Sequence, residues 1–525
     1  MVKSLAQLGD LQVSYCKKMK AIITKEEGLG LEISETLAFP MLTNLNLNHL
    51  ESLMCFSCKK CSREARSQDR IKSYSTALFS KEVAFPKLEA LDITSLDNIE
   101  MIWDNKVAAD SFPKLKSLCV VDCNKLVSVV RSFILRWLLS LERLDARRCN
   151  SLEVVFELQP LNHLDGHPIA LPFEELTISR LPKLKCIWDK ELHCQIKFQC
   201  LRSISVSRCE SLTYLFPASV ARDLIRLEEL EIDECGIAKI IKNEEGLVPR
   251  FVFPMLTSLK LKYLRELKCL YIGAHTSYWP ALKTLNMRGC DKVEILVSHS
   301  VNEMPLDKPP FFLIEKGGFP SLQELELDLS EWMEIWHGHF HHGEFFCKLS
   351  LLKLHHLSQE SLISTCCFVE SLTNLKELVV CESYLEDPSS NEEAIEGTSH
   401  EMKVILPFSR YIRHLQTLDV SHCDGLSKMF TPTTAENLVA LTKLKISNCR
   451  MLTEVINDEK GGEGRVVAFN RLKYMELDGL TGLRSFSSQR YTLMFPLLED
   501  VIVTRCPNMK FFSQGPIEAS KLKRV

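Results

Sequence analysis

The amino-acid sequence predicts a solenoid, in which short coils of chain stack on one another and each adds one strand to a parallel sheet. Similar segments recur with first leucines 26 or 27 residues apart in eight pairs; for example, LKSLCVVDCNKLVSVV begins at Leu115 and LERLDARRCNSLEVVF at Leu141. A fixed step of this length is typical of repeat architectures, because one unit cannot bury its apolar side chains without a neighbour.

The shared pattern is L-x-x-L-x-L-x-x-C/L-x-x-L-x-x-I/L/F, the leucine-rich repeat signature. Its x-L-x-L-x part alternates with period two, which predicts a short strand with two inward leucines. The predicted fold is therefore an α/β leucine-rich repeat solenoid, a horseshoe with a concave parallel β-sheet and short helical or irregular convex segments. The first apolar positions of the units are Leu8, Leu42, Leu88, Leu115, Leu141, Phe173, Leu201, Leu227, Leu256, Leu282, Leu322, Leu349, Leu375, Leu415, Leu441, Leu472 and Leu498.

The domain organisation follows from how these units are distributed. Residues 1–525 are expected to form a single array of about 17 repeats of ~26 residues each. The step lengthens near 57–82, 299–316 and 386–408, where the sequence is polar, acidic or contains proline. We interpret these three segments as loop insertions of the array.

Cysteine usage fits a reduced protein with structural thiols. The 21 cysteines of this long chain are too sparse for a disulfide scaffold. Nine of them occupy the turn position after a strand, where a small apolar side chain can stack on its neighbours. We predict that these nine are buried and unpaired: Cys16, Cys123, Cys149, Cys209, Cys235, Cys290, Cys423, Cys449 and Cys506.

Composition and charge limit the classes of binding partner and the cellular location that we expect. Hydrophobic residues make up 46% and charged residues 25% of the chain, an ordinary globular balance. The net charge of −4 gives no basic field that would favour nucleic acid. The sequence has no apolar run long enough for a transmembrane segment and no signal-peptide core at its start. A cytoplasmic location is therefore expected.

Motifs for chemistry are missing from the sequence. There is no phosphate-binding G-x-x-x-x-G-K-[ST] loop and no G-x-G-x-x-G, so we expect no nucleotide-binding domain, no cofactor and no enzyme activity. Cys55, Cys58 and Cys61 imitate a zinc spacing, but a structural zinc site needs four ligands, and we interpret them as loop thiols rather than a metal site. The histidine-rich run at 336–346 is interpreted as a loop in the same way.

Three units end in Ile-Trp: Ile102-Trp103, Ile187-Trp188 and Ile335-Trp336. An indole at this position is expected to cover the convex edge of the core, and partner binding is the alternative.

The outward face of the sheet can be assigned by register. When the first leucine of a unit is counted as zero, offsets +2, +4 and +6 face outward. Rows of opposite charge then adjoin, and Glu231–Lys260 and Asp233–Lys262 are expected to be lateral neighbours. These rows either bind a protein partner or neutralise one another, each exposed pair then contributing at most about 1 kcal/mol. The candidate partner-binding residues are Glu229, Glu231, Asp233, Lys260, Lys262, Asn286, Arg288, Glu324, Glu326 and Asp328.

Several long segments carry a family resemblance. The runs at 214–271, 429–456 and 495–515, together with the Ile-Trp endings, resemble the C-terminal leucine-rich repeats of plant coiled-coil nucleotide-binding (NBS-LRR) disease resistance proteins. The resemblance implies a protein-interaction module of innate immunity that senses pathogen effectors or guarded host proteins and regulates a nucleotide-binding switch. That switch has no counterpart in the sequence, so the chain is expected to be a fragment of a disease resistance protein.

Two other kinds of protein use similar repeats. The substrate-recognition adaptor of an F-box-type ubiquitin ligase also has cysteine-bearing repeats of about 26 residues, and it remains the alternative function. It requires a helical F-box ahead of the array, whereas the first repeat here begins near Met1. An extracellular receptor would show a signal peptide, paired cysteine caps and L-x-G-x-I-P coils, and the sequence has none of these.

Overall fold

The computed structural model describes most of the chain, including every strand of the main sheet. The described residues are 6–25, 37–59, 77–157 without 82, 106, 108–110 and 136, 169–188, 196–244, 249–298 without 274, 309–337 without 315–317 and 330–333, 345–383 without 359–360, 362–364 and 366–367, 413–457, and 464–525. They divide into two units, Met1–Leu256 with Leu261–Thr276 and Thr257–Lys260 with Ser277–Val525.

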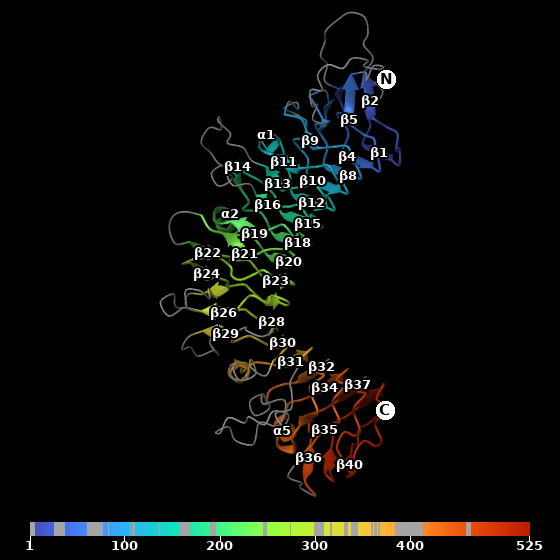
Figure 1. Cartoon of the computed structure of the whole chain (residues 1–525), viewed down its shortest axis with the longest axis vertical. Helices are drawn as coiled ribbons and strands as arrows, with labels where there is room; N and C mark the ends of the chain where they lie inside the picture. The colour runs from blue at the N-terminus through green and yellow to red at the C-terminus, as the bar shows by residue number, and fades with distance from the viewer. Residues whose placement is uncertain are drawn as a thin grey trace, which may run out of the picture. The chain divides into compact units, whose positions relative to one another are not determined.

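The first unit contains eight parallel strands that pair in chain order (Figure 1). Each has five residues and lies where the leucine spacing predicts it. The strands are β1 (Asp10–Ser14), β4 (Asn44–Asn48), β8 (Ala90–Thr94), β10 (Ser117–Val121), β12 (Arg143–Arg147), β15 (Glu175–Ser179), β18 (Ser203–Ser207) and β20 (Glu229–Asp233).

The second unit repeats this arrangement with eight more parallel strands. They are β25 (Thr284–Met287), β28 (Glu324–Asp328), β30 (Leu351–His355), β31 (Glu377–Cys381), β32 (Thr417–Ser421), β34 (Lys443–Ser447), β37 (Tyr474–Asp478) and β39 (Asp500–Thr504). Residues of β23 (Ser258–Lys262) belong to both units. The seventeen strands confirm the predicted leucine-rich repeat solenoid.

The core of each unit is built from the inward positions of these strands. In β10, Leu118 and Val120 are buried, whereas Ser117, Cys119 and Val121 are partly exposed. Leu118 lies opposite Leu91 of the preceding coil and Leu144 of the next. Leucines of successive coils therefore cover one another, and burying one such side chain contributes about 1.5–3 kcal/mol.

A left-handed residue follows almost every strand of the sheet. Fourteen described non-glycine residues have φ between 49° and 58°; Gly289 and Gly479 occupy the same position in two other coils. The amide of this residue donates to the last strand carbonyl of the next coil, as Arg148 N does to Ser179 O at 2.9 Å. This conformation costs a non-glycine residue about 1–2 kcal/mol, which the inter-coil hydrogen bond helps to offset.

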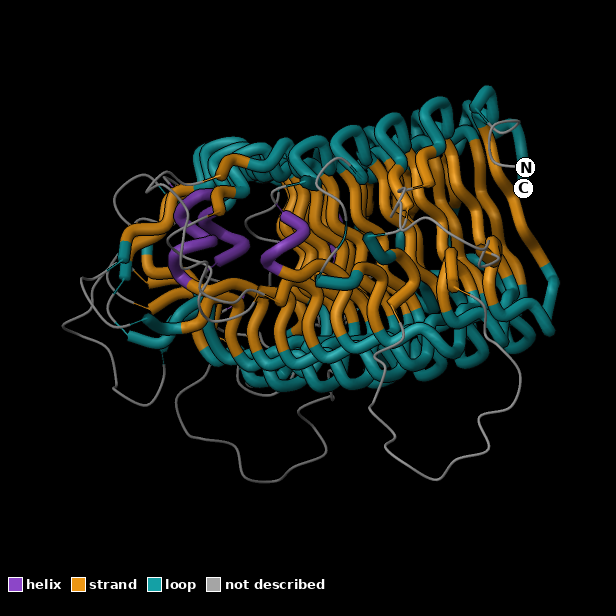
Figure 2. Tube along the Cα trace, turned by 90° about the horizontal axis from the view of Figure 1, so that it is seen from above, coloured by secondary structure: helices purple, strands orange, loops and turns teal. Residues whose placement is uncertain are grey.

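The side of each coil that returns from the sheet carries short strands, where the sequence had predicted helical or irregular segments. Figure 2 shows these strands and the few helices, with loops connecting them to the main strands. Runs such as Val154–Phe156 and Met101–Trp103 favour extended backbone because they are rich in β-branched and aromatic residues. The paired strands are β2 (Ala21–Lys25) with β5 (Cys55–Lys59), β3 (Leu37–Ala38) with β7 (Val83–Ala84), β6 (Ala77–Phe79) with β9 (Met101–Trp103), β11 (Ser128–Arg131) with β13 (Val154–Glu157) and β16 (Cys186–Trp188), β14 (Ile169–Ala170) with β17 (Ile196–Lys197), β19 (Tyr214–Pro217) with β21 (Lys239–Lys242), β22 (Arg250–Val252) with β24 (Thr276–Tyr278), β26 (Ile295–Ser298) with β27 (Phe312–Leu313) and β29 (Glu334–His337), β33 (Lys428–Phe430) with β35 (Glu454–Ile456), and β36 (Val466–Ala468) with β38 (Thr492–Met494) and β40 (Ile517–Glu518).

Short helices lie beside these strands, and the bounds of three of them are described. They are α1 (Ser132–Leu135), α2 (Ala218–Asp223) and α5 (Pro432–Asn437). In the last, Thr431 is the N-cap and its side chain accepts from the amide of Thr434. Within the described ranges, no helix is long and apolar enough to cross a bilayer.

Phenylalanines of the Phe-Pro segments form a second buried row. The ring of Phe85 stacks on that of Phe39 at 5.3 Å between centroids and lies 5.6 Å from that of Phe112. All three side chains are buried. The proline after each phenylalanine fixes φ before the next strand, so the aromatic row and the leucine rows are held in the same register.

The indoles of Trp103 and Trp188 are buried, as expected for residues that cover the core. Their ring nitrogens have no hydrogen-bond partner, so these two indoles act by packing. The side chain of Trp336 lies outside the described residues. So do most of the three predicted insertions, the side chains of Cys58 and Cys61, and most of the histidine-rich run.

None of the nine turn-position cysteines is in a disulfide, but they are not all buried. Seven are buried as predicted, whereas Cys16 is exposed and Cys506 is partly exposed. The prediction was wrong for these two because each belongs to an outermost coil of the described array, where no further coil covers the turn. In the buried ones the thiol faces backbone carbonyls, as Cys235 Sγ does toward Asp233 O at 3.2 Å.

The buried thiols should resist modification in the native protein. We expect iodoacetamide to label Cys16 and Cys347, which are exposed, long before the seven buried turn thiols, because the reagent cannot reach a sulfur that is enclosed between coils. Site-resolved mass spectrometry after timed alkylation measures this. Labelling of Cys149 as fast as Cys347 would contradict the packing described here. The seven buried turn cysteines are Cys123, Cys149, Cys209, Cys235, Cys290, Cys423 and Cys449.

The left-handed turn position should discriminate between side chains. Ser95 has φ of 54°, so Ser95→Val should lower the free energy of unfolding by about 1–2 kcal/mol, because a β-branched side chain is strained there. Ser95→Gly should not destabilise. Thr94→Val in the adjoining strand is the matched control and should change stability by less than about 0.5 kcal/mol. Urea denaturation of the three variants decides, and equal losses for both valines would refute the strain.

Candidate functional site

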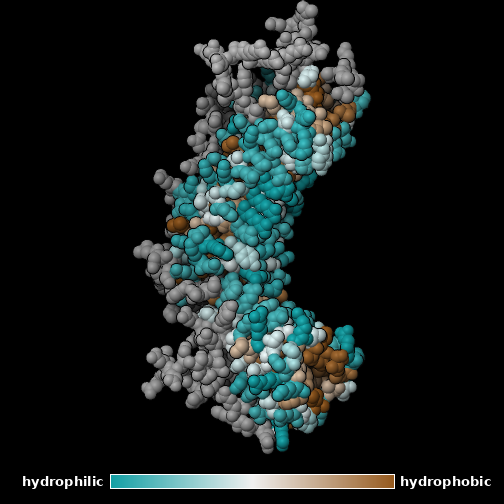
Figure 3. All heavy atoms as spheres, turned by 45° about the vertical axis from the view of Figure 1, so that its right-hand side comes forward, coloured by the Kyte–Doolittle hydropathy of each residue, from teal (hydrophilic) through white to brown (hydrophobic). Residues whose placement is uncertain are grey.

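The outward side chains of the sheet strands form a face that the core does not use. In β20, Leu230 and Ile232 are buried, while Glu229 is exposed and Glu231 and Asp233 are partly exposed. This is the alternation that the register predicted. Figure 3 shows that much of the visible surface of the first unit is hydrophilic.

The candidate residues of the first unit centre on the acidic strand β20. Lys262 Nζ lies 2.8 Å from Glu231 Oε1. This ion pair runs diagonally between the strands, whereas the sequence had predicted Glu231 beside Lys260. Asp233 Oδ1 is buried without a hydrogen-bond partner. Burial, and secondly the charge of Glu234, raise the pKa of Asp233. This strand therefore presents carboxylates that are only partly neutralised.

Strand β18 lies directly beside the acidic strand and has only serines on its outward face. Ser203, Ser205 and Ser207 are in register with Glu229, Glu231 and Asp233. Ser207 Oγ donates to Ser179 Oγ at 3.0 Å. The short hydroxyl side chains leave the neighbouring carboxylates accessible from that side.

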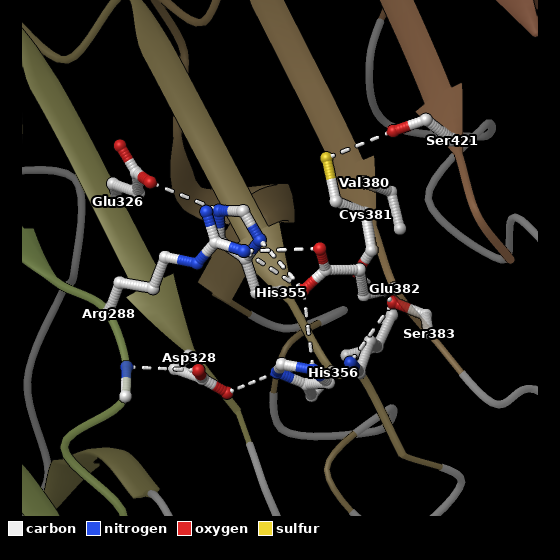
Figure 4. A network of polar contacts seen from close by, with 12 residues as sticks. Arg288, Glu326, Asp328, His355, His356, Val380, Cys381, Glu382, Ser383 and Ser421 are labelled. Carbon is white, nitrogen blue, oxygen red and sulfur yellow. Dashed lines mark hydrogen bonds and ion pairs between the residues drawn. The ribbon is translucent and has the colours of Figure 1, made fainter. Parts of the chain in front are cut away.

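The second unit contains a larger polar network over β25, β28, β30 and β31 (Figure 4). Arg288 Nη2 donates to both carboxylate oxygens of Glu382 at 3.1 Å. Asn286 Nδ2 donates to Glu326 Oε2 at 2.9 Å, and Lys353 Nζ lies 3.9 Å from the same oxygen. The network thus links four successive coils through side chains alone.

Two adjacent histidines connect its carboxylates. His355 Nε2 lies 3.1 Å from Glu326 Oε1, and its Nδ1 lies 4.0 Å from Glu382 Oε2. His356 Nδ1 lies 2.8 Å from Asp328 Oδ1, and its Nε2 lies 3.4 Å from Glu382 Oε2. The His355 side chain is 7% exposed and that of His356 is 39% exposed, so only His356 is readily accessible to a partner.

Burial differs among the candidate residues of this unit. Asp328 is buried, contrary to the prediction of an exposed outward side chain. Gly289 N donates to its Oδ2 at 3.0 Å and His356 covers the other oxygen, so Asp328 shapes the turn after β25 and is not itself a contact surface. Glu324 is exposed, and its Oε2 accepts from Thr284 Oγ1 at 3.5 Å.

The structure also adds residues that the sequence did not single out. Lys353, His355, His356 and Glu382 belong to the network, but β30 and β31 lay outside the region of alternating charge. His356 and Glu382 occupy left-handed turn positions, which the outward offsets did not include. Counting offset +7 as an outward position would have identified both.

The arrangement suits the binding of a protein and offers partly desolvated donors and acceptors. The hydrogen bond from His355, ahead of the nearby charges, lowers the pKa of Glu326 against the effect of burial. Within the described residues, no group of three or more side chains could hold a metal ion. Whether the ten candidate residues act together on one partner stays a prediction.

The pKa of Glu326 gives a test of the network. Its carboxylate should stabilise the fold fully above the unfolded-state pKa of about 4.3, and this contribution should be lost as pH falls through the lower folded pKa. Glu326→Gln should therefore lower the free energy of unfolding at pH 7 by about 1 kcal/mol. Near pH 3 the variant and the wild type should be equally stable. Glu324→Gln on the same strand is the control, and urea denaturation from pH 3 to 7 measures both. Identical pH profiles for the two variants would contradict the network.

Comparison with known proteins identifies a matching family. The family described as "Plant disease resistance protein RPS2-like, leucine-rich repeats" matches residues 86–236 and 389–514, together more than half of the chain. Two relatives from Arabidopsis thaliana are similar over shorter segments. Disease resistance protein SUMM2 is 30% identical over 105 residues, and putative disease resistance protein At3g14460 is 36% identical over 104 residues.

These alignments cover only part of each protein. They span 20% and 19% of this chain, and 11% and 7% of the two relatives. Among solved structures, that of a TLR13–ssRNA13 complex is 16% identical, with a TM-score of 0.31 over 90% of this chain and 69% of that one. The leucine-rich repeat protein LIC12759 of Leptospira interrogans is 14% identical, with a TM-score of 0.29 over 97% of both chains. TM-scores this low say nothing about function.

Proposed function

Because the chain belongs to the leucine-rich repeat family of RPS2-like plant disease resistance proteins, we propose that it is a protein-interaction module of plant innate immunity. The observation that carries this proposal is the family match over more than half of the chain. The module senses a pathogen effector or a guarded host protein and regulates the nucleotide-binding switch of a receptor. It acts in the cytoplasm and carries out no catalysis of its own.

The outward face of the sheet supports this role. Its side chains are not needed for stacking, because the buried leucines alternate with them along every strand. The charged groups of β20 and of the network at β25–β31 are partly desolvated, which makes their interactions with a partner stronger than those of fully exposed charges. Arginine is also enriched among residues that dominate protein interfaces, and Arg288 lies within the network.

A binding experiment with paired charge reversals tests the proposal. The probes are a separately expressed nucleotide-binding region of a plant disease resistance protein and a panel of pathogen effectors. Glu231→Lys should weaken binding at least about fivefold and reduce its salt dependence, because it removes one carboxylate and breaks the ion pair between Glu231 and Lys262. Surface plasmon resonance at two salt concentrations measures the change.

The control is an ion pair of similar geometry on another surface. Lys185 Nζ lies 2.7 Å from Glu153 Oε2, outside the outward strand positions. Glu153→Lys should leave binding within about twofold, since surface pairs contribute little. If no probe binds, the proposal fails. If Glu231→Lys alters stability alone and the Lys262→Glu reversal restores it, the charges neutralise one another and the site is wrong.

A further inference from the structure

The left-handed turn positions of three successive coils in the first unit are all arginine. Arg148, Arg180 and Arg208 follow β12, β15 and β18, with φ of 53°, 56° and 54°. Their amides donate to the next coil at 2.9 Å in each case, so the three backbones are held in line. Neighbouring strands lie about 4.8 Å apart. We call these three residues the arginine row.

The two outer members of the row are neutralised by carboxylates outside it. Arg148 Nε and Nη2 each donate at 2.7 Å to the two oxygens of Asp122, one coil earlier. Arg208 Nε donates at 2.7 Å to Glu234 Oε2, one coil later. Both outer guanidinium groups are therefore drawn away from the middle of the row.

The middle member, Arg180, is exposed, and it makes no ion pair in the part of the chain that the structure describes. Along this edge the charges run negative, positive, positive, positive, negative from Asp122 to Glu234. The nearby Arg147 is already paired with Asp145 at 2.6 Å. Within the row, Arg180 is therefore the guanidinium that no carboxylate neutralises in the described part of the chain.

The surroundings of Arg180 fix its backbone but leave its guanidinium available. The Ser207–Ser179 hydroxyl bond lies at the ends of β18 and β15, next to the row. A planar guanidinium presents a fork of donors that matches a carboxylate with two parallel hydrogen bonds. The carboxylates that neutralise Arg148 and Arg208 point away from Arg180, so they leave its fork of donors unoccupied.

We propose that the arginine row is a docking site for an acidic side chain of a protein partner, with Arg180 as its anchor. This inference rests on the proposed function as a protein-interaction module and names the chemistry that one part of its surface recognises. The partner presents an aspartate or glutamate to Arg180, flanked by groups that tolerate Arg148 and Arg208. The site differs from the candidate residues of β20 and of the second-unit network.

A peptide-binding assay on the full chain tests this proposal without a known partner. The probe is a fluorescein-labelled, acetylated hexapeptide of alternating glutamate and glycine, and its glutamine counterpart is the neutral control. Fluorescence anisotropy at low salt should show saturable binding of the acidic peptide alone. Arg180→Gln should weaken it about tenfold or more, as expected for loss of a bidentate charged hydrogen bond. Arg180→Lys should weaken it about threefold, since the ammonium keeps the charge but not the fork.

Arg226 provides the matched control variant. It is an exposed arginine of the same unit outside the row, so Arg226→Gln should change the dissociation constant by less than about twofold. Circular dichroism and urea denaturation of each variant establish that the fold is retained. Wild-type affinity in Arg180→Gln, or equal losses in Arg180→Gln and Arg226→Gln, would overturn the proposal.

Two further outcomes are distinguishable. Tighter binding of a single-stranded oligonucleotide than of the acidic peptide would show that the row recognises phosphate on nucleic acid, and would overturn the assignment of a protein partner. Peptide binding that depends on Arg180, together with failure of every immune probe, would retain the site and reject the proposed immune function. If the wild-type chain does not bind the acidic peptide but does bind an immune probe, the docking site is rejected and the proposed immune function is retained.

Discussion

The stacking of one coil on the next is the constraint on which the whole structure depends. A single coil cannot shield its own inward side chains from water. Leu118 is buried because Leu91 and Leu144 of the two neighbouring coils lie on either side of it. The backbone obeys the same rule, since the amide after each strand finds its acceptor in the following coil. Local stability in such an array is therefore a sum of contacts between neighbours.

The same constraint separates the residues that make the fold from those that are free to recognise a partner. Inward positions carry leucine, isoleucine or valine almost throughout, whereas outward positions vary from three serines in β18 to three carboxylates in β20. The turn residue after the strand is a further variable position, because its backbone is fixed by hydrogen bonding and its side chain is not. This position supplies His356 and Glu382 in one unit and the arginine row in the other.

The period of the leucines was enough to predict the sheet, because both the strand and its burial are local consequences of period-two alternation. It also placed Cys123 and Cys149 at buried turns correctly. The strands on the returning side were not foreseen, since the composition of short runs such as Val154–Phe156 favours extended backbone but their period does not specify a paired strand. The site could be predicted only in part. Arg288 and Glu382 are 94 residues apart in sequence, and their contact depends on side-chain reach across three coil interfaces, which no periodicity specifies.

The in-register pairing of neighbouring strands has a consequence for how the array can change in length. Leu118 and Val120 lie opposite Leu91 and Ile93 of the preceding coil. They lie opposite Leu144 and Ala146 of the next coil in the same register. Loss of residues 115–140, one whole repeat, would bring Leu91 opposite Leu144 and restore every class of contact at the new junction. A one-residue slip in the pairing of a strand would instead move its inward leucines to the outward face. Gain or loss of complete coils is therefore a length change that preserves the stacking of the strands, and each such change would bring a different pair of charged rows side by side.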